Sequence, residues 1–368
     1  MDALMLPLNW QRVRLGDIFF ITAGGDLSKP HYSNTKQSDF NYPIYSNAIE
    51  KKGLYGYSSF FIIKNKSITI TSRGTIGVAF FRDYPYVPIG RLLVLQPKIS
   101  NIDCRFYAEY INSKVKFNTE QTTIPQLTIP KVALCEIPLP PLNEQIAIAN
   151  ILSALDHYLY TLDALILKKE SVKKALRIKM LNQILASNGV EFKKIGEICL
   201  IKRGRVIAKK ILQENGKYPV YSSQTLNNGI LGFIDTYDFD GEFLTWTTDG
   251  AYAGSVFYRN GRFSITNVCG LLQVIQDNIL HKYLYYILQI TAPLHVNPGM
   301  GNPKLMSAAM QQIEIPLPPL NEQIAIANIL SALDNEITSL KNKKSQFENI
   351  KKALNHDLMS AKIRVLKK

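Results

Sequence analysis

Side chains able to carry out catalysis are scattered along this chain of 368 residues, and they form no familiar catalytic set. Nucleotide-driven motion would require a GxxxxGK[ST] run, which the sequence does not contain. An adenine methyltransferase would require an Asn-Pro-Pro-aromatic loop, whereas Asn297-Pro298 is followed by glycine and Asn302-Pro303 by lysine. The histidines follow no metal-ligand spacing. They are His31, His157, His281, His295 and His356.

Carboxylates gather at Asp235, Asp238 and Asp240, in an expected turn. A nuclease needs an acidic pair and a lysine on adjoining strands, and no such set can be assembled around this cluster. We therefore expect no catalytic residue, no metal site and no cofactor in this chain. A self-contained endonuclease or methyltransferase is the competing hypothesis, which turnover by the isolated chain with magnesium or S-adenosylmethionine would support.

The remaining polar chemistry is suited to binding a polyanion. The net charge is +14, from 43 Lys and Arg against 29 Asp and Glu, and DNA is a natural partner for this excess. Base edges are read by amide, guanidinium and hydroxyl groups, while lysine and arginine bind phosphates and fix the register. In the first half of the chain we expect these groups at Ser46, Asn47, Lys51, Ser72, Arg73, Thr75, Arg91 and Gln126. In the second half we expect them at Lys202, Arg203, Arg205, Ser222, Ser223, Gln224, Asn227, Thr248, Asp249, Tyr252, Asn302 and Lys304. For each one, an ordinary exposed loop residue is the alternative.

Strand-like segments stand directly before many of these residues. Alternating β-branched and aromatic residues followed by glycine-bearing turns predict strands at 67–71 and 243–247, with further buried strands at 92–95 and 271–275. Short helices are expected near 106–115 and 282–289. The two halves match faintly here, since Tyr42-Pro43-Ile44-Tyr45-Ser46 corresponds to Tyr218-Pro219-Val220-Tyr221-Ser222. Each half therefore predicts a mixed α/β globule of similar plan.

One segment is repeated without change. Residues Glu136–Asp156 read EIPLPPLNEQIAIANILSALD, and Glu314–Asp334 repeat it with an offset of 178 residues. The prolines stiffen an extended lead, after which Asn143 and Asn321 are expected to cap a helix. Each helix should run roughly 40 residues, or about 60 Å. Its apolar stripe predicts a coiled-coil seam. The stripe comprises Leu155, Leu159, Leu162, Ile166, Leu176 and Met180 in the first copy, and Leu333, Ile337, Leu340, Phe347, Leu354 and Leu358 in the second.

The expected architecture follows from this order of parts. It is α/β (α+β), with two similar globular domains bearing twisted mixed β-sheets at 1–141 and 188–319. Two long helices, at 142–187 and 320–368, separate the domains and form an antiparallel, pseudo-twofold coiled coil; a parallel pair or two ordinary core helices are the alternatives. No apolar run is long enough to span a membrane, and four unpaired cysteines fit a reducing cytoplasm.

The duplicated segment, the long helix after each copy and the divergent region before each copy together resemble the specificity (S) subunits of type I restriction-modification systems. The motif Ile-Pro-Leu-Pro-Pro-Leu-x-Glu-Gln stands at 137–145 and 315–323, and the resemblance covers essentially the whole chain. It implies two target recognition domains that bind a bipartite, asymmetric site in double-stranded DNA. It also implies assembly with two methyltransferase (M) subunits and, where restriction occurs, two translocase-nuclease (R) subunits. These partners would supply the S-adenosylmethionine, ATP and magnesium chemistry.

Identity between the copies is explained if two identical partners dock on two identical surfaces. The residues expected to dock them are Glu144, Gln145, Ile148, Ile151, Glu322, Gln323, Ile326 and Ile329. Recent duplication or recombination would also leave the copies unchanged, and the sequence does not separate these causes. A coiled-coil scaffold that binds only proteins is a further alternative for the whole chain. This alternative would be favoured if charge reversal at Arg73 and Arg203 had no effect on DNA binding.

Overall fold

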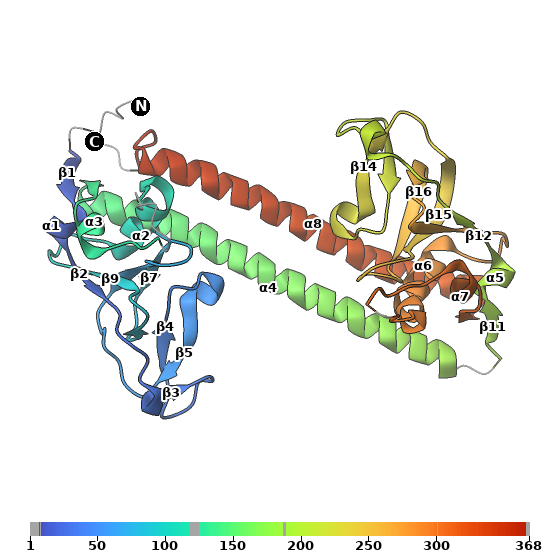
Figure 1. The fold of residues 1–368 in the computed structure, drawn as a ribbon, viewed down its shortest axis with the longest axis horizontal. Coiled ribbons are helices and arrows are strands. Elements are labelled where there is room, and N and C mark those ends of the chain that lie inside the picture. Colours follow the sequence, from blue (N-terminus) through green and yellow to red (C-terminus); the bar gives the residue numbers. More distant parts are fainter. Residues whose placement is uncertain (1–6, 8, 118–124, 187–188, 300, 366–368) are drawn as a thin grey trace. The chain divides into compact units, whose positions relative to one another are not determined.

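A computed structural model describes residues 7, 9–117, 125–186, 189–299 and 301–365. The chain divides into two compact units (Figure 1). Unit 1 comprises residues 1–163 and 342–368, and unit 2 comprises residues 164–341. The long helices α4 (Leu142–Ala186) and α8 (Leu320–Met359) each contribute to both units. The expected boundary at 187 and 188 lies outside the described residues.

Unit 1 contains two four-stranded sheets among its described residues, in the orders β2-β9-β6-β7 and β3-β5-β4-β8. All neighbours are antiparallel except β4 and β8, which run parallel, so the strands form a mixed arrangement. The elements are β1 (Gln11–Arg14), α1 (Leu15–Ile18), β2 (Phe19–Ala23), η1 (Lys29–His31), β3 (Tyr32–Ser33), β4 (Tyr42–Tyr45), η2 (Glu50–Gly53), β5 (Leu54–Ser58), β6 (Ser67–Ile70), β7 (Ala79–Arg82), β8 (Val87–Pro88), β9 (Leu93–Pro97), α2 (Cys104–Lys114), α3 (Ile129–Ala133) and β10 (Glu136–Leu139).

Unit 2 has the same plan with longer strands. Its described residues form one six-stranded sheet in the order β12-β17-β15-β16-β13-β14, in which β13 and β16 run parallel. The elements are β11 (Glu191–Lys194), α5 (Ile195–Ile198), β12 (Cys199–Arg203), η3 (Lys209–Ile211), β13 (Tyr218–Tyr221), η4 (Leu226–Gly229), β14 (Ile230–Ile234), β15 (Phe239–Thr247), β16 (Val256–Ile265), β17 (Cys269–Val274), α6 (His281–Thr291), η5 (Ala292–His295), α7 (Ser307–Gln311) and β18 (Glu314–Leu317). The predicted strands and short helices are confirmed, and the long continuous β15 and β16 take the place of the separate β6, β7 and β8 of unit 1.

The proline-rich lead of each repeated segment is a strand at the edge of the unit. β10 pairs antiparallel with β1, and β18 pairs antiparallel with β11, each as an isolated two-stranded sheet. Proline is tolerated in such strands because one side of each needs no ladder donor. The long helices begin directly after, at Leu142 and Leu320, so Asn143 and Asn321 lie inside the first turn. The predicted N-caps are therefore wrong by two residues: the carbonyl of Pro141 accepts from the backbone N–H of Glu144 and Gln145.

The two long helices pack together and run antiparallel, as expected (Figure 1). In unit 1, Lys351 pairs with Asp156 at 2.6 Å and Lys344 with Asp163 at 2.7 Å, so higher numbers on α8 meet lower numbers on α4. In unit 2, Lys169 pairs with Glu336 at 2.8 Å, and Lys173 pairs with Asp334. Lys169, Lys173 and Lys344, which lie between residues of the apolar stripes, thus form ion pairs between the helices. Figure 1 shows α4 in green and α8 in red.

Each unit completes its core with the end of a long helix that started in the other. In unit 1, Leu358 and Met359 of α8 pack with Phe106 and Tyr107 of α2 and Ile148 of α4. In unit 2, Ile184 of α4 packs in the core that also holds Tyr283 of α6 and Trp246 of β15. Burial of a large apolar side chain contributes about 1.5–3 kcal/mol. Both helix ends are therefore integral to the units that present the loops described next.

Candidate nucleic-acid interface

The loops of unit 1 that follow β4 and β6 are held together by one asparagine. Asn47 donates from Nδ2 to the carbonyl of Gly90 at 2.6 Å, and its Oδ1 accepts from the backbone N–H of Ser72 at 2.7 Å. The Ser72 hydroxyl donates to the carbonyl of Arg91 at 2.7 Å. We call loops 46–53, 72–77 and 89–92 the unit 1 loop cluster, because these hydrogen bonds bring segments from three parts of the sequence together.

Six of the eight predicted DNA-binding residues of unit 1 remain available, five in this cluster and the sixth, Gln126, beside it. Arg73, Thr75, Lys51 and Arg91 are exposed, Ser46 and Gln126 are half-buried, and Arg73 donates to Gln126 Oε1 at 3.5 Å. Ser72 is fully buried, so the prediction that it contacts bases is corrected. Asn47 is half-buried with its amide group committed to the loops, which gives it a structural role here.

Unit 2 presents a corresponding set, which we call the unit 2 loop cluster: loops 203–206, 222–229, 248–254, 266–268 and the described residues of 297–305. The 266–268 loop joins them. Thr266 donates its hydroxyl to Ser222 Oγ at 3.0 Å, Arg203 donates to the carbonyl of Asn267, and the backbone N–H of Thr248 donates to the carbonyl of Val268. The cluster therefore brings together Arg203, Ser222 and Thr248, three of the residues expected to bind DNA.

The other predicted residues of unit 2 divide into exposed and committed groups. The exposed ones include Asn227, Tyr252, Asn302 and Lys304, while Ser223 and Asp249 are half-buried. Thr248 is buried, so the prediction that it contacts bases is wrong, as it is for Ser72.

Three further side chains of this group already have partners inside unit 2. Arg205 forms an ion pair with Asp238 at 3.0 Å, and Gln224 donates to the carbonyl of Ile230. Lys202 lies on strand β12 and donates to Gln273 Oε1 at 3.0 Å, away from the loops.

A buried arginine supports a loop in each unit, and sequence reasoning missed both. Arg82 lies 3.6 Å from the Tyr45 ring centroid, donates to Thr69 Oγ1 at 3.1 Å and donates to the carbonyl of Lys52 at 2.6 Å. Its loop is unusual because Lys51 and Lys52 both have positive φ, at 48° and 55°. Arg82 therefore holds a strained turn in place.

The same arrangement recurs in unit 2. Arg259 lies 3.5 Å from the Tyr221 ring centroid and donates to Thr245 Oγ1 at 3.1 Å. Asn227 and Asn228 have φ of 48° and 53°. The signal that could have found these arginines is the shared pattern of two aromatic residues before arginine, Phe80-Phe81-Arg82 and Phe257-Tyr258-Arg259.

A buried glutamine fastens each long helix to its unit. Gln145 donates from Nε2 to the carbonyls of Asn101 and Pro140, at 3.0 and 2.8 Å, and its Oε1 accepts from the backbone N–H of Asp103 at 2.9 Å. Gln323 makes the same three bonds in unit 2, at 3.0, 2.9 and 2.9 Å. The repeated Glu-Gln of the sequence is therefore partly a structural device.

Burial corrects part of the predicted docking surface. Glu144, Gln145, Ile148 and Gln323 are buried within their units. Trp10 and Arg364 contact Glu144, and Ile148 lies in the core that holds Phe106 of α2. The segments just before α2 and α6 contact the two glutamines. Ile151 and Ile329 are 37% and 46% exposed, and Glu322 is exposed as well. Ile146 and Ile324, which the prediction left out, are 38% and 42% exposed. Two isoleucines thus remain exposed at equivalent positions of the repeated segment in both units.

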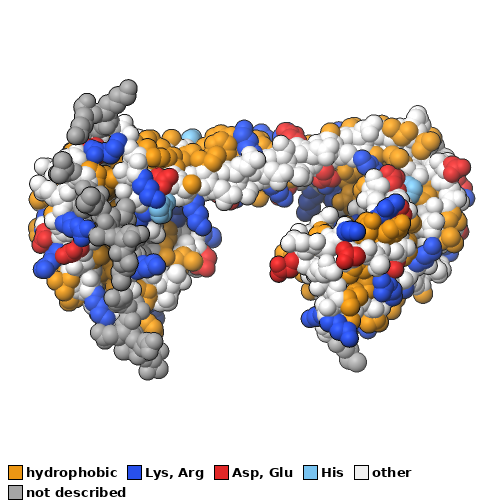
Figure 2. All heavy atoms as spheres, turned by 90° about the horizontal axis from the view of Figure 1, so that it is seen from above, with side chains coloured by type: hydrophobic (Ala, Val, Ile, Leu, Met, Phe, Trp, Pro, Cys, Tyr) orange, Lys and Arg blue, Asp and Glu red, His pale blue; other side chains and the backbone are white. Residues whose placement is uncertain are grey.

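The excess of positive side chains fits a surface that binds a polyanion. Figure 2 shows more Lys and Arg side chains than Asp and Glu on both globular parts. Burial raises the pKa of the Cys104, Cys199 and Cys269 thiols to about 12, which leaves them protonated and poorly nucleophilic at neutral pH. Among the described residues, no group of three or more His, Cys, Asp and Glu could hold a metal ion, and no helix is long and apolar enough to cross a membrane.

Comparison with known proteins places these features in a family. A model of the type I restriction modification DNA specificity domain matches the chain twice, over residues 7–169 and 187–349. A putative type I specificity subunit of Mycoplasma pneumoniae is 40% identical over 218 residues, which cover 57% of this chain and 80% of that protein. The specificity subunit of the type I restriction enzyme MpnII of the same organism is 48% identical over 141 residues, or 38% of this chain and 42% of that protein.

Solved structures agree on the fold. The crystal structure of a type I restriction-modification S subunit from M. genitalium matches with a TM-score of 0.72 at 20% identity, covering 96% of this chain and 98% of that chain. A structure described in terms of complex assembly and conformational transition of a type I system matches with a TM-score of 0.51 at 16% identity, over 96% of this chain and 98% of that chain. The two mixed-sheet domains and the packed long helices are thus a shared architecture.

Proposed function

Since the chain belongs to the DNA specificity family of type I restriction-modification systems, we propose that each globular domain reads one half of a bipartite, asymmetric site in double-stranded DNA. The chain is the noncatalytic specificity subunit of such a system. In our proposal the long helices set the distance between the half-sites, and the loop clusters of units 1 and 2 supply the contacts.

The observation that carries this proposal is a shared backbone frame with different side chains. Ser46 and Ser222 each donate a backbone N–H to a glycine carbonyl, and the carbonyls of Ser72 and Thr248 each accept from a leucine N–H at 2.9 Å. Within this frame Arg73 of unit 1 stands where unit 2 has an aspartate. A cation and an anion at one frame position favour different base edges, because guanidinium donates to guanine while carboxylate accepts from cytosine.

The turn after β4 and β13 differs in the same way. Its two residues with positive φ are Lys51 and Lys52 in unit 1, but Asn227 and Asn228 in unit 2. Lysine binds phosphate as a point charge, whereas asparagine can pair with adenine through both its oxygen and its nitrogen. An asymmetric site requires two domains that share a backbone frame and differ in the side chains that contact DNA.

The test is to give one domain the side chain of the other. Arg73→Asp should weaken recognition of the half-site read by unit 1 and leave the other half-site unchanged, measured by methylation of a duplex library with the cognate methyltransferase. Each lost phosphate contact should lower the slope of log affinity against log salt by about 0.9. Lys168→Asp, a charge reversal on an exposed helix position, is the control. One uninterrupted footprint, or equal loss at both half-sites, would refute the two-domain reading.

Partner docking is the second part of the proposal. Two methyltransferase subunits would bind the start of α4, where Ile146 and Ile151 are exposed, and the start of α8, where Ile324 and Ile329 are exposed. Isoleucines exposed at 37–46% in identical sequence surroundings support this assignment, since exposed apolar patches mark protein interaction sites. The S-adenosylmethionine would belong to those subunits, and ATP and magnesium to two translocase-nuclease subunits where restriction occurs. A DNA-directed complex of this kind would act in the cytoplasm.

Single substitutions can separate the two docking sites. Ile151→Asp and Ile329→Asp should each reduce the number of methyltransferase subunits bound from two to one, measured by sedimentation or mass photometry. Leu167→Asp is the matched control, because Leu167 is 64% exposed on α4 but lies outside the repeated segment. Unchanged stoichiometry in both repeat variants, or an equal effect in the control, would contradict docking at these faces.

A further inference from the structure

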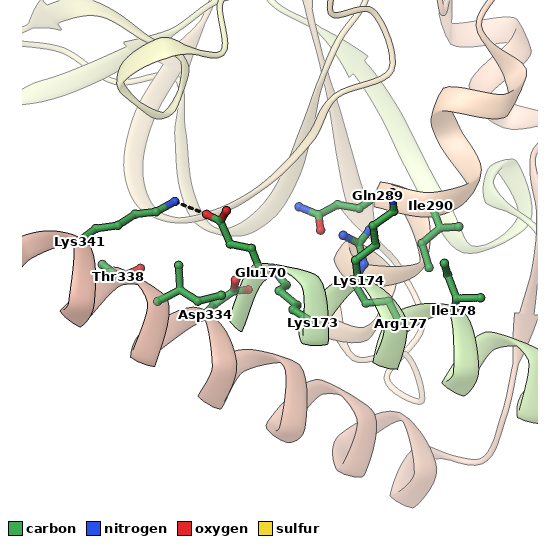
Figure 3. A pocket seen from close by; sticks show the side chains of 11 residues that line it. Glu170, Lys173, Lys174, Arg177, Ile178, Gln289, Ile290, Asp334, Thr338 and Lys341 are labelled. Carbon is green, nitrogen blue, oxygen red and sulfur yellow. Dashed lines mark hydrogen bonds and ion pairs between the residues drawn. The ribbon is translucent and has the colours of Figure 1, made fainter. Parts of the chain in front are cut away.

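Unit 2 contains a cavity of about 540 Å³ where α4, α6 and α8 meet (Figure 3). Its wall includes Lys173, Lys174 and Arg177 of α4, Gln289 of α6 and Lys341 of α8. Figure 3 shows the ion pair between Glu170 and Lys341 at one end, with Gln289, Lys174 and Arg177 toward the other. The first question is whether the positive charges around this cavity are balanced.

Half of them are. Lys341 pairs with Glu170 at 2.6 Å, and Lys173 pairs with Asp334. Within the described part of the chain, neither Lys174 nor Arg177 forms an ion pair. The cavity therefore has an excess of two positive charges, on neighbouring turns of one helix.

Two polar atoms at the cavity also lack partners. Arg177 Nε and Gln289 Oε1 are buried and make no hydrogen bond in the described structure. An unpaired buried donor or acceptor costs about 1–3 kcal/mol, and more for a charged group. Burial also lowers the pKa of the Arg177 guanidinium, which reflects the same loss of solvation. One positively charged donor and one acceptor at the cavity thus make no hydrogen bond, and Asp334, the carboxylate nearby, is already paired with Lys173.

Unit 1 has a carboxylate of its own at the equivalent place. The hydrogen bonds of Tyr107 to the carbonyl of Pro138 and of Tyr283 to the carbonyl of Pro316 align α2 with α6. In this alignment Glu109 of α2 stands where α6 has Tyr285. The helix repeat places Asn355 of α8 where α4 has Arg177.

Glu109 is the internal anion of unit 1. Its Oε1 lies 3.7 Å from Lys351 Nζ, and its Oε2 accepts from Asn355 Nδ2 at 3.0 Å. In unit 2 the carboxylate is replaced by tyrosine while the asparagine is replaced by arginine. Both changes move the site in the same direction, toward an unpaired cation.

We propose that the cavity of unit 2 binds a phosphate group that carries a protonated oxygen, as in inorganic phosphate at neutral pH or in a phosphate monoester below its second pKa of about 6. Its charged oxygens accept from Arg177 and Lys174, and its P–OH donates to Gln289 Oε1. Arginine suits this role because its planar fork matches two oxygens of a phosphate. A DNA phosphodiester and a sulfate lack the hydroxyl donor at neutral pH, so they satisfy only part of the site. This proposal stands apart from DNA reading by the loop clusters.

Binding is tested on the full chain by calorimetry and thermal unfolding with sodium phosphate, adenosine monophosphate, sodium sulfate and a short duplex, all at one ionic strength and at a pH of about 6, where much of the monoester is protonated. Phosphate or the monoester should bind with saturation and raise the unfolding temperature of unit 2, as any ligand selective for the native state does. The free ion and the monoester distinguish the source of the group. Equal effects of all four anions, or none, would overturn the proposal.

Variants sharpen the test. Arg177→Asn installs the residue of unit 1, fits the helix, and should weaken phosphate binding roughly 10- to 100-fold, the value of a charge-assisted hydrogen bond. Gln289→Leu should bring phosphate affinity down to that of sulfate, because it removes the acceptor that distinguishes them. Lys168→Asn, which removes one positive charge from an exposed place on α4, should leave both affinities unchanged. Equal weakening by Lys168→Asn, or full affinity in Arg177→Asn, would refute the site.

Discussion

Replacing Gln145 with leucine should destabilise unit 1 and leave unit 2 nearly unchanged. The side chain is fully buried and makes three hydrogen bonds to backbone groups, at 2.8–3.0 Å. A net hydrogen bond contributes about 1 kcal/mol, and a buried group left without a partner costs about 1–3 kcal/mol. Leucine fills most of the volume, so we expect a loss of about 3 kcal/mol in the free energy of unfolding, less than the sum because the backbone relaxes.

The chain has a built-in reporter for each unit. It contains two tryptophans: Trp10 is buried in unit 1 and donates to Glu144, while Trp246 is buried in unit 2 and donates to the carbonyl of Leu305. Trp246→Phe leaves Trp10 to report on unit 1, and Trp10→Phe does the converse. With a urea slope of about 1–3 kcal/mol/M, Gln145→Leu should lower the Trp10 midpoint by roughly 1–3 M. Gln323→Leu should shift the Trp246 midpoint by a similar amount.

A glutamate at the same position separates hydrogen bonding from packing. Gln145→Glu keeps the acceptor for Asp103 but, when ionised, sets a carboxylate oxygen against the carbonyls of Asn101 and Pro140. Its pKa in the folded state should therefore rise above the unfolded value. Stability should approach that of the parent chain below the unfolded pKa and fall as the pH rises through the folded pKa. A Trp10 midpoint unchanged in Gln145→Leu, or equal shifts for both tryptophans, would refute the reasoning.

Three further outcomes follow from the packing. Burial alone would raise the pKa of Glu144, but hydrogen bonds from neighbouring side chains and a nearby arginine lower it, so its stabilising contribution is present above the unfolded pKa and is lost as pH falls through the folded value. Glu144→Gln should flatten the acid dependence of unit 1 unfolding, whereas Glu322→Gln, at an exposed glutamate, should not. Gly270→Ala should destabilise unit 2 by about 2–3 kcal/mol in urea unfolding, because the added Cβ would lie 2.2–2.4 Å from the ring of Trp246. Arg82→Met should speed amide hydrogen exchange in the turn after β4 while the core strands stay protected, and uniform exchange would contradict a local role.

The helices and strands were predictable because their signals are local. A 21-residue repeat, an apolar stripe and alternating β-branched residues each describe a segment by its own letters, and α4, α8, β6 and β15 appear where these patterns stand. The N-cap positions failed by two residues because the carbonyl of Pro141 already closes the first turn. Helix ends depend on such short-range competition more than on the stripe.

The site was only partly predictable because its key contacts join distant segments. Ser72 looked like an exposed turn residue, but the 89–92 loop covers it and its hydroxyl donates to Arg91, 19 positions away. Gln145 looked like a surface residue of a helix start, but the 101–103 segment wraps it from 42 to 44 positions away. Arg82 went unnoticed because its partner Tyr45 lies 37 positions away in the sequence. None of these partners is visible in local periodicity.

The exact repetition of the helix start is not explained by packing alone. Gln145 and Gln323 make the same buried bonds, so their identity follows from the fold. The identity of Glu144 and Glu322 does not follow from the fold. Glu144 is buried and accepts hydrogen bonds from Trp10 and Arg364, whereas Glu322 is exposed. Packing would allow these two positions to differ, as it would the exposed isoleucines. Their identity therefore requires either a common partner at both faces or a recent duplication, and Ile329→Asp distinguishes the two, because only a partner would make that exposed side chain necessary for assembly.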